Sequence, residues 1–203
     1  MVRFSLGIFS LAVALLWAPA MPVKSAQIAI IIDDVGNNRL RDAATFALPK
    51  NVAVSILPHK SMSQKYAVLA QEQQREFLLH MPMESMAGIK QEPNVLLASM
   101  DSRTTVLTQA ETIAKQWQVP TMRRHVFLDN DLAVEKIDRQ FNLLLRKARK
   151  YGRSLAIGHP HRQTIAYLQQ RLPKLADDNV QLISLSAMLL LQGDNAQKSV
   201  ITE

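Results

Sequence analysis

Six consecutive residues, Gln27 to Ile32, constrain this chain more than any other feature, because they form a nearly unbroken run of β-branched side chains with the sequence QIAIII. A continuous apolar run of this length is typical of a strand in a parallel sheet that is covered on both faces. Asp33 and Asp34 follow at its end. The run therefore predicts the central strand of an α/β fold, with an acidic pair where the strand stops.

Strand-like and helix-like patterns alternate along the rest of the chain. Strands are predicted at 52–57, 77–80, 119–128, 154–158 and 180–184, and helices near 39–47, 62–74, 106–117, 133–151 and 161–172, before a short terminal helix. This alternation predicts a mostly parallel sheet or a barrel, in which functional groups gather at the carboxyl ends of the strands. Residues 81–100 show no clean period, and so long an irregular stretch is usually functional.

The first residues predict export. Arg3 precedes an uncharged apolar run, residues 5–17, which is shorter than the roughly 20 residues that span a bilayer. The small residues at 18–20 suit a cleavage site, and a cut after Ala26 is the alternative. We expect a signal peptide within 1–26, a periplasmic or secreted location, one domain over 27–192 and a disordered tail at 193–203. An uncleaved anchor or a buried N-terminal helix is the other interpretation.

The amino-acid composition limits the kinds of functional site and partner that we expect. The chain has no cysteine, which excludes zinc–thiolate sites, cysteine nucleophiles and redox motifs, so any metal must be held by His, Asp, Glu or water. The net charge is +7, and the one sizeable cluster of cations, Arg146 to Arg153, contains the single aromatic Tyr151. Such a cluster is usually the solvated face of a helix and does not indicate base stacking. We expect no nucleic-acid partner and membrane contact only through the export signal, although charge alone does not separate an anionic envelope polymer from a membrane surface.

Polar residues follow the predicted strands at one end of the sheet: Asp33, Asp34, His80, Asp129 and His159. Two adjacent carboxylates repel each other, and a divalent cation resolves this if one becomes its ligand and the other accepts a proton from water. The simpler alternative is that one Asp caps the following helix and the other is solvated.

Two histidine motifs extend this prediction. His80 is followed four residues later by Glu84, and imidazole with carboxylates suits zinc or a similar ion. Gly158 and Pro160 flank His159 and would aim it into the site, where it could protonate a leaving group. Three other histidines are expected outside this role: His125 and His161 exposed, and His59 on the rim.

Several stretches together resemble one known family. They are IAIIIDDVG (28–36), VAVSILPH (52–59), EFLLHMPME (76–84), MDSRTT (100–105), RRHVFLDND (123–131) and SLAIGHPH (154–161). In this order they resemble the divergent polysaccharide deacetylases, a branch of the NodB-like carbohydrate esterases. The resemblance implies a distorted, incomplete (β/α) barrel that removes acetyl groups from a polysaccharide or peptidoglycan-like glycan with a divalent metal, for which Zn²⁺ is the expected ion.

The resemblance also assigns roles at the catalytic centre. It implies that Asp33 is the catalytic base and that His159 assists the leaving group. Asp34 and His80 would be metal ligands, and Glu84 stands where ordinary deacetylases place a second metal histidine.

Further residues would support this centre. Asp101 and Asp129 would be acids near the site, with Arg123 and Arg124 orienting them.

The chain departs from the family pattern at one place. Relatives carry an Asn-Asn-His-Met-Gly-Ser segment between the HMPME and DSRT elements, whereas Met100 here runs directly into Asp101. The sequence thus leaves two functions open, a metal-dependent deacetylase and an inactive glycan-binding or envelope-assembly protein. A phosphohydrolase with an aspartyl nucleophile is a third class, but its acids are normally spaced Asp-x-Asp, unlike Asp33-Asp34.

Overall fold

The structure is a computed structural model that describes residues 25–80, 116 and 121–191. Several predictions lie outside these residues: the signal peptide up to residue 24, the irregular stretch 81–100, all but residue 116 of the helix at 106–117, and the tail at 193–203. Glu84, Asp101 and the Met100–Asp101 junction lie outside them as well. Within the described residues, no helix is both long and apolar enough to cross a membrane.

The predicted central strand is the centre of the sheet. Strand β1, Ala26–Val35, pairs in parallel with β5, Arg153–Gly158, in a continuous register from Gln27 opposite Arg153 to Ile32 opposite Gly158. On its other side β1 pairs with β6, Val180–Leu182, near its start and with β2, Ala53–Ile56, near its end. Residues 28–32 are all buried, because side chains that alternate along the strand enter two different apolar clusters.

The strand order is β3-β2-β1-β5-β4, with β6 beside β1, and every pair is parallel. Strand β3 is Phe77–Leu79, and β4 is only Val126–Phe127, shorter than the predicted 119–128. The predicted α/β class with a parallel sheet is therefore confirmed. Closure into a barrel would have to join β3 to β4 through residues 81–120, almost all outside the described residues, so the barrel stays a prediction.

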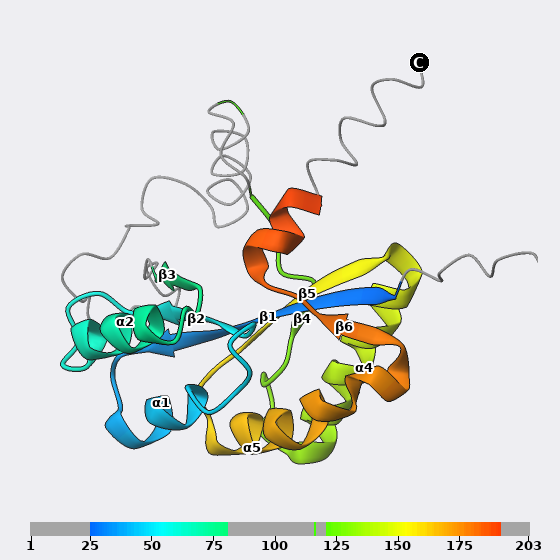
Figure 1. Cartoon of the computed structure of the whole chain (residues 1–203). Helices are drawn as coiled ribbons and strands as arrows, with labels where there is room; N and C mark the ends of the chain where they lie inside the picture. The colour runs from blue at the N-terminus through cyan, green and yellow to red at the C-terminus, as the bar shows by residue number, and fades with distance from the viewer. Residues whose placement is uncertain (1–24, 81–115, 117–120, 192–203) are drawn as a thin grey trace, which may run out of the picture.

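The larger apolar cluster lies between the sheet and the helices (Figure 1). These are α1, Arg39–Thr45; α2, Ser63–Glu72; α4, Val134–Tyr151; α5, Arg162–Arg171; and the 3-10 helix η2, Leu172–Asp178. The opposite face carries a smaller cluster, which the helical segment 185–191 covers. Helix α4 buries the face predicted from its sequence, including Ile137, Phe141 and Leu144.

Arg75 connects the loops that precede β2 and β3. Its side chain is buried, and its guanidinium donates hydrogen bonds to four backbone carbonyls, those of Phe46, Leu48, Pro49 and Val52, and to the side chain of Gln73. A buried cation needs such a full set of acceptors, because each one replaces a lost contact with water. Arg75 thereby fixes the start of β3, the strand that leads to His80.

Candidate active site at the carboxyl ends of the strands

The acidic pair lies in a β-bulge. Ile32 is opposite Val54 and Val35 is opposite Ile56, so that β1 advances three residues while β2 advances two. The predicted strand end is therefore an irregularity inside β1, which continues to Val35. Asp34 has a φ of 59°, in the left-handed region that non-glycine residues seldom adopt.

This bulge explains how two adjacent carboxylates reach one imidazole. Side chains of successive residues in a regular strand point to opposite faces, and a bulge re-aims one of them. Here Nδ1 of His80 lies 2.6 Å from Oδ1 of Asp33 and 3.4 Å from Oδ1 of Asp34. The structure thus brings together three of the predicted residues, Asp33, Asp34 and His80.

Asp42 holds the turn that follows the bulge. Its buried Oδ2 accepts hydrogen bonds from the backbone N–H of Gly36 at 2.8 Å and of Asn38 at 2.9 Å. Asn38 in turn caps α1 through its side chain, which accepts from two backbone N–H groups. The helix cap that sequence reasoning considered for one member of the acidic pair is therefore supplied by Asn38, which leaves both carboxylates available to the site.

The first carboxylate–imidazole pair is Asp33 with His80. Burial by itself would raise the pKa of Asp33, but hydrogen bonds from His80 and from the Ser55 hydroxyl outweigh it and hold the pKa below its ordinary value. The hydrogen bond to Asp33 raises the pKa of His80, although burial acts in the opposite direction. Asp33 is therefore ionised at neutral pH, as a proton acceptor must be.

The second pair is Asp129 with His159. Asp129 follows β4, and its buried carboxylate accepts from His159 Nδ1 at 3.0 Å, from the His159 backbone N–H at 2.6 Å and from the Thr164 hydroxyl at 2.8 Å. Gly158 permits this approach, because a Cβ there would lie 3.2 Å from Thr164 Cγ2 and 3.4 Å from Asp129 Oδ2. Asp129 thus fixes the ring orientation of His159 through Nδ1 and does not engage Nε2.

The electrostatics of the second pair favour a protonated imidazole. Burial alone would raise the pKa of Asp129, but its bonds to His159 and Thr164 lower it below the ordinary value. The hydrogen bond to Asp129 raises the pKa of His159 against the effect of burial, and the charges of Asp129, Asp34 and Asp33 add to the increase. His159 is therefore suited to donate a proton.

Asp34 joins the two pairs into one site. Its Oδ2 lies 3.8 Å from His159 Nε2, while its Oδ1 lies 3.4 Å from His80 Nδ1. The side chain of Asp34 is 48% exposed, compared with 20% for Asp33. Of the two adjacent acids, Asp34 is therefore the one that an incoming ion or substrate reaches first.

Among the residues that the structure describes, two groups of side chains could hold a metal ion, each with its ligand atoms within 4.8 Å of one another. They are Asp33 with Asp34 and His80, and Asp129 with His159 and His161. The second group is the poorer site, because its buried Asp129 already accepts three hydrogen bonds. The first group offers an accessible carboxylate and an imidazole, which suits a divalent ion such as zinc.

Other predicted residues have different surroundings. The exposed Arg124 places its guanidinium 4.4 Å from the centre of the Phe127 ring, which itself lies 5.1 Å from the His159 ring, so its predicted role in orienting the acids stays a prediction. Arg123 is exposed, and its orienting role likewise stays a prediction. Glu84 and Asp101 lie outside the described residues, and their roles stay predictions as well.

The three remaining histidines differ from one another. His161 was expected to be exposed but is half-buried, with its ring 5.8 Å from that of His159. His125 is exposed as expected, yet its Nδ1 accepts a hydrogen bond from the Leu155 backbone. His59 is exposed and has a φ of 58°.

Sequence reasoning missed two hydroxyl groups of the site. Ser55 bonds Asp33 and Thr164 bonds Asp129. Ser55 is a polar residue within an apolar strand, a pattern that could have marked it. Thr164 carries no such signal, because a helix exposes many polar residues.

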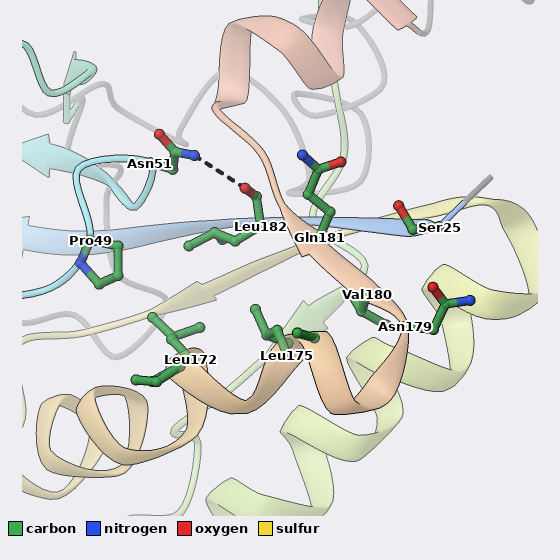
Figure 2. Close-up of a pocket in the computed structure, with 11 residues that line it drawn as sticks. Ser25, Pro49, Asn51, Leu172, Leu175, Asn179, Val180, Gln181 and Leu182 are labelled. Atoms are coloured by element: carbon green, nitrogen blue, oxygen red, sulfur yellow. Dashed lines mark hydrogen bonds between the residues drawn. The ribbon is translucent and has the colours of Figure 1, made fainter. Parts of the chain in front are cut away.

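A separate pocket lies at the other end of the sheet (Figure 2). It has a volume of about 760 Å³, and its lining includes Asn51, Leu172, Leu175, Asn179 and Gln181. Asn51 donates a hydrogen bond to the Leu182 carbonyl there. Among the described residues that line it there is no Asp, Glu, His, Lys or Arg.

Comparison with known proteins places the chain among relatives without an assigned activity. It is 30% identical to an uncharacterized protein of Haemophilus influenzae, over 79% of this chain and 75% of the relative. It is 28% identical to the uncharacterized protein YibQ of Escherichia coli K12, over 88% of this chain and 72% of the relative. The crystal structure of the uncharacterized protein ATU2773 from Agrobacterium tumefaciens C58 has a similar fold, with a TM-score of 0.72 and 17% identity, over 84% of this chain and 92% of that one.

The family comparison covers most of the chain. The sequence model of the family described as "Divergent polysaccharide deacetylase" matches residues 30–101 and 96–189. These two stretches contain every residue of the two carboxylate–imidazole pairs. The chain belongs to the divergent polysaccharide deacetylase family.

Proposed function

We propose that this protein is an exported, metal-dependent deacetylase that hydrolyses N-acetyl groups on an envelope or extracellular glycan. The main support is the position of Asp34 between two carboxylate–imidazole pairs. Its Oδ1 lies 3.4 Å from His80 Nδ1, and its Oδ2 lies 3.8 Å from His159 Nε2. Amide hydrolysis needs a proton acceptor for water and a proton donor for the departing nitrogen, and the pairs supply one of each.

The residues fit a divalent cation, which Asp34 and His80 would hold. When bound, such a cation would polarise the acetyl carbonyl and a water molecule. Zn²⁺ suits a site of imidazole and carboxylate without thiolate. Glu84 is the further ligand that the family resemblance implies.

The protein's own groups would move the protons. Asp33 is ionised, partly buried and oriented by His80 and Ser55, so it would accept the proton of the attacking water. His159 is oriented by Asp129, whose hydrogen bond raises the pKa of the imidazole and favours its protonated form, so its Nε2 would donate to the amine nitrogen as the C–N bond breaks. The hydrolysis releases acetate and leaves a free amine on the glycan.

We also propose that the chain lacks an internal segment at Met100–Asp101. In support, the two family matches meet at residues 96–101. In addition, the alignment with the Haemophilus influenzae protein extends over 212 positions, whereas 79% of 203 residues is about 160, so about 50 aligned positions have no counterpart in this chain. The segment that relatives carry there contains a histidine, and its loss would weaken metal binding.

Acetate release from N-acetylglucosamine oligomers tests the activity. Purified protein with added Zn²⁺ should release acetate, and Asp33→Asn should lower the rate by at least about 100-fold, because the proton acceptor is removed. Asp177→Asn, which changes an exposed acid on η2, is the matched control and should keep the wild-type rate. Absence of acetate release from wild-type protein, or an unchanged rate in Asp33→Asn, would contradict the proposal.

The alternative is a glycan-binding or envelope-assembly protein that has kept the fold and lost catalysis. The missing histidine segment favours it. Retained binding of the same oligomers, without bound metal after Zn²⁺ addition and without acetate release, would select this function.

A further inference from the structure

The C-terminal half of α4 and the start of β5 carry an unusual concentration of positive charge. Residues 139–153 contain six cations and no acid: Arg139, Arg146, Lys147, Arg149, Lys150 and Arg153. Four of them, with one aromatic residue, form what we call the basic surface: Arg146, Lys147, Lys150, Tyr151 and Arg153. This surface plays no part in the proposed hydrolysis.

The acid Asp178 forms ion pairs with Arg149 and Arg171 and with no residue of the basic surface. Asp178 accepts from Arg149 at 3.1 Å and from Arg171 at 2.6 Å, which is why Arg149 is left out of the basic surface. Among the ion pairs of the part of the chain that the structure describes, none involves Arg146, Lys147, Lys150 or Arg153. The surface therefore keeps its positive potential.

Cations of helix α4 and of strand β5 meet at the turn between these elements. Helix α4 ends at Tyr151 and β5 begins at Arg153, so Lys150 and Arg153 lie on either side of this turn. The charges of Lys147 and Arg153 both lower the pKa of His125, in addition to the effect of burial.

Tyr151 gives the surface an amphipathic component. Its side chain is 65% exposed at the end of α4, and Lys150 Nζ lies 5.1 Å from the centre of its ring. An exposed aromatic ring among cations is typical of protein surfaces at the boundary between water and lipid.

The basic surface lies at the end of the sheet opposite the candidate active site. Arg153 begins β5 and His159 follows its last residue, and six residues of strand span roughly 20 Å. The start of β1 lies beside Arg153, since Gln27 pairs with it and donates a hydrogen bond to the Gly152 carbonyl at 3.0 Å. Figure 1 shows the turn between α4 and β5 next to the beginning of β1.

We propose that the basic surface binds the anionic phospholipid headgroups of a bilayer, with the candidate active site facing away from the membrane. Clusters of four or more cations attract anionic lipid surfaces. The start of β1 lies at this same end, beside Arg153. A soluble glycan substrate is the less suitable occupant, because it must reach the carboxyl ends of the strands.

Co-sedimentation with vesicles tests this proposal on the full chain. The probes are vesicles of phosphatidylglycerol mixed with phosphatidylcholine, vesicles of phosphatidylcholine alone, and soluble dextran sulfate. Arg146→Glu with Lys150→Glu reverses two exposed cations of the basic surface. Lys136→Glu with Arg139→Glu is the matched control, with the same charge change on exposed residues near the other end of α4.

We expect wild-type protein to bind the anionic vesicles with an affinity that falls as salt rises. The Arg146/Lys150 variant should bind at least about tenfold more weakly, and the Lys136/Arg139 variant within about twofold of wild type. Any contribution of the apolar run is common to all three proteins and is measured on neutral vesicles. Equal losses in both variants would overturn the proposal, as would unchanged vesicle binding, or a loss confined to dextran sulfate. Circular dichroism of each variant would verify its fold.

Discussion

Nε2 of His159 lies 3.8 Å from Oδ2 of Asp34, and this contact joins two carboxylate–imidazole pairs that come from different strands. Asp34 belongs to the bulge in β1, whereas His159 follows β5, the neighbouring strand. Each imidazole has its own carboxylate partner, so Asp34 is left as the accessible acid between them.

Asp34→Asn should weaken Zn²⁺ binding by at least about tenfold, because an amide replaces the accessible carboxylate ligand. Competition with a chromophoric chelator measures this affinity without reference to activity. Asp177→Asn should bind Zn²⁺ like wild type, since that acid is exposed on η2. Equal affinity in Asp34→Asn and wild type would remove Asp34 from the metal site.

Asp129→Asn should destabilise the protein in a pH-dependent way. The folded pKa of Asp129 is lowered from 3.8, so its contribution is present above that value and is lost as pH falls through the lowered pKa. The folded pKa of His159 is raised from 6.5, so its contribution is present below that value and is lost as pH rises through the raised pKa.

The difference in unfolding free energy between wild type and Asp129→Asn should therefore be largest between about pH 4 and pH 6.5, at about 2 kcal/mol. Urea denaturation at about pH 5.5 and at about pH 9 would measure it. A difference that does not change between these two pH values would show that Asp129 acts through packing alone.

Gly158→Ala should cost about 2 kcal/mol, because the new Cβ meets Thr164 Cγ2 at 3.2 Å and Asp129 Oδ2 at 3.4 Å. It should also move Asp129 and bring the pKa of His159 back toward its ordinary value, which NMR titration of the imidazole would show. Gly152→Ala is the control: it meets no atom within 4 Å and strains only a φ of 80°, so it should destabilise the protein and leave His159 unchanged.

Arg75→Met should lower the free energy of unfolding by about 3 kcal/mol, because it removes a buried charged donor and leaves backbone carbonyls without a partner. Arg139→Met, at an exposed position of α4, should change it by no more than about 0.5 kcal/mol. Urea denaturation at neutral pH compares the two. Similar values for both variants would show that the backbone acceptors of Arg75 are satisfied in another way.

The apolar and helical periods of the sequence determined the α/β class, most elements and the end of the sheet at which the site lies. QIAIII is apolar on both sides and so had to lie between two covered faces, and α4 buries the face that its period of apolar residues indicated. Asp33, Asp34, His80, Asp129 and His159 were found because carboxyl ends of parallel strands share one edge. These inferences need only the local pattern of apolar and polar residues along the chain.

The tertiary structure alone decided how these side chains pair. The bulge that aims Asp33 and Asp34 at one imidazole depends on the register between β1 and β2, which is set by contacts distant in sequence. The same holds for Ser55 beside Asp33 and Thr164 beside Asp129, whose hydroxyls become site residues only when neighbouring elements pack. Sequence therefore indicated which chemical groups gather near Asp34, and packing decided which carboxylate pairs with which imidazole.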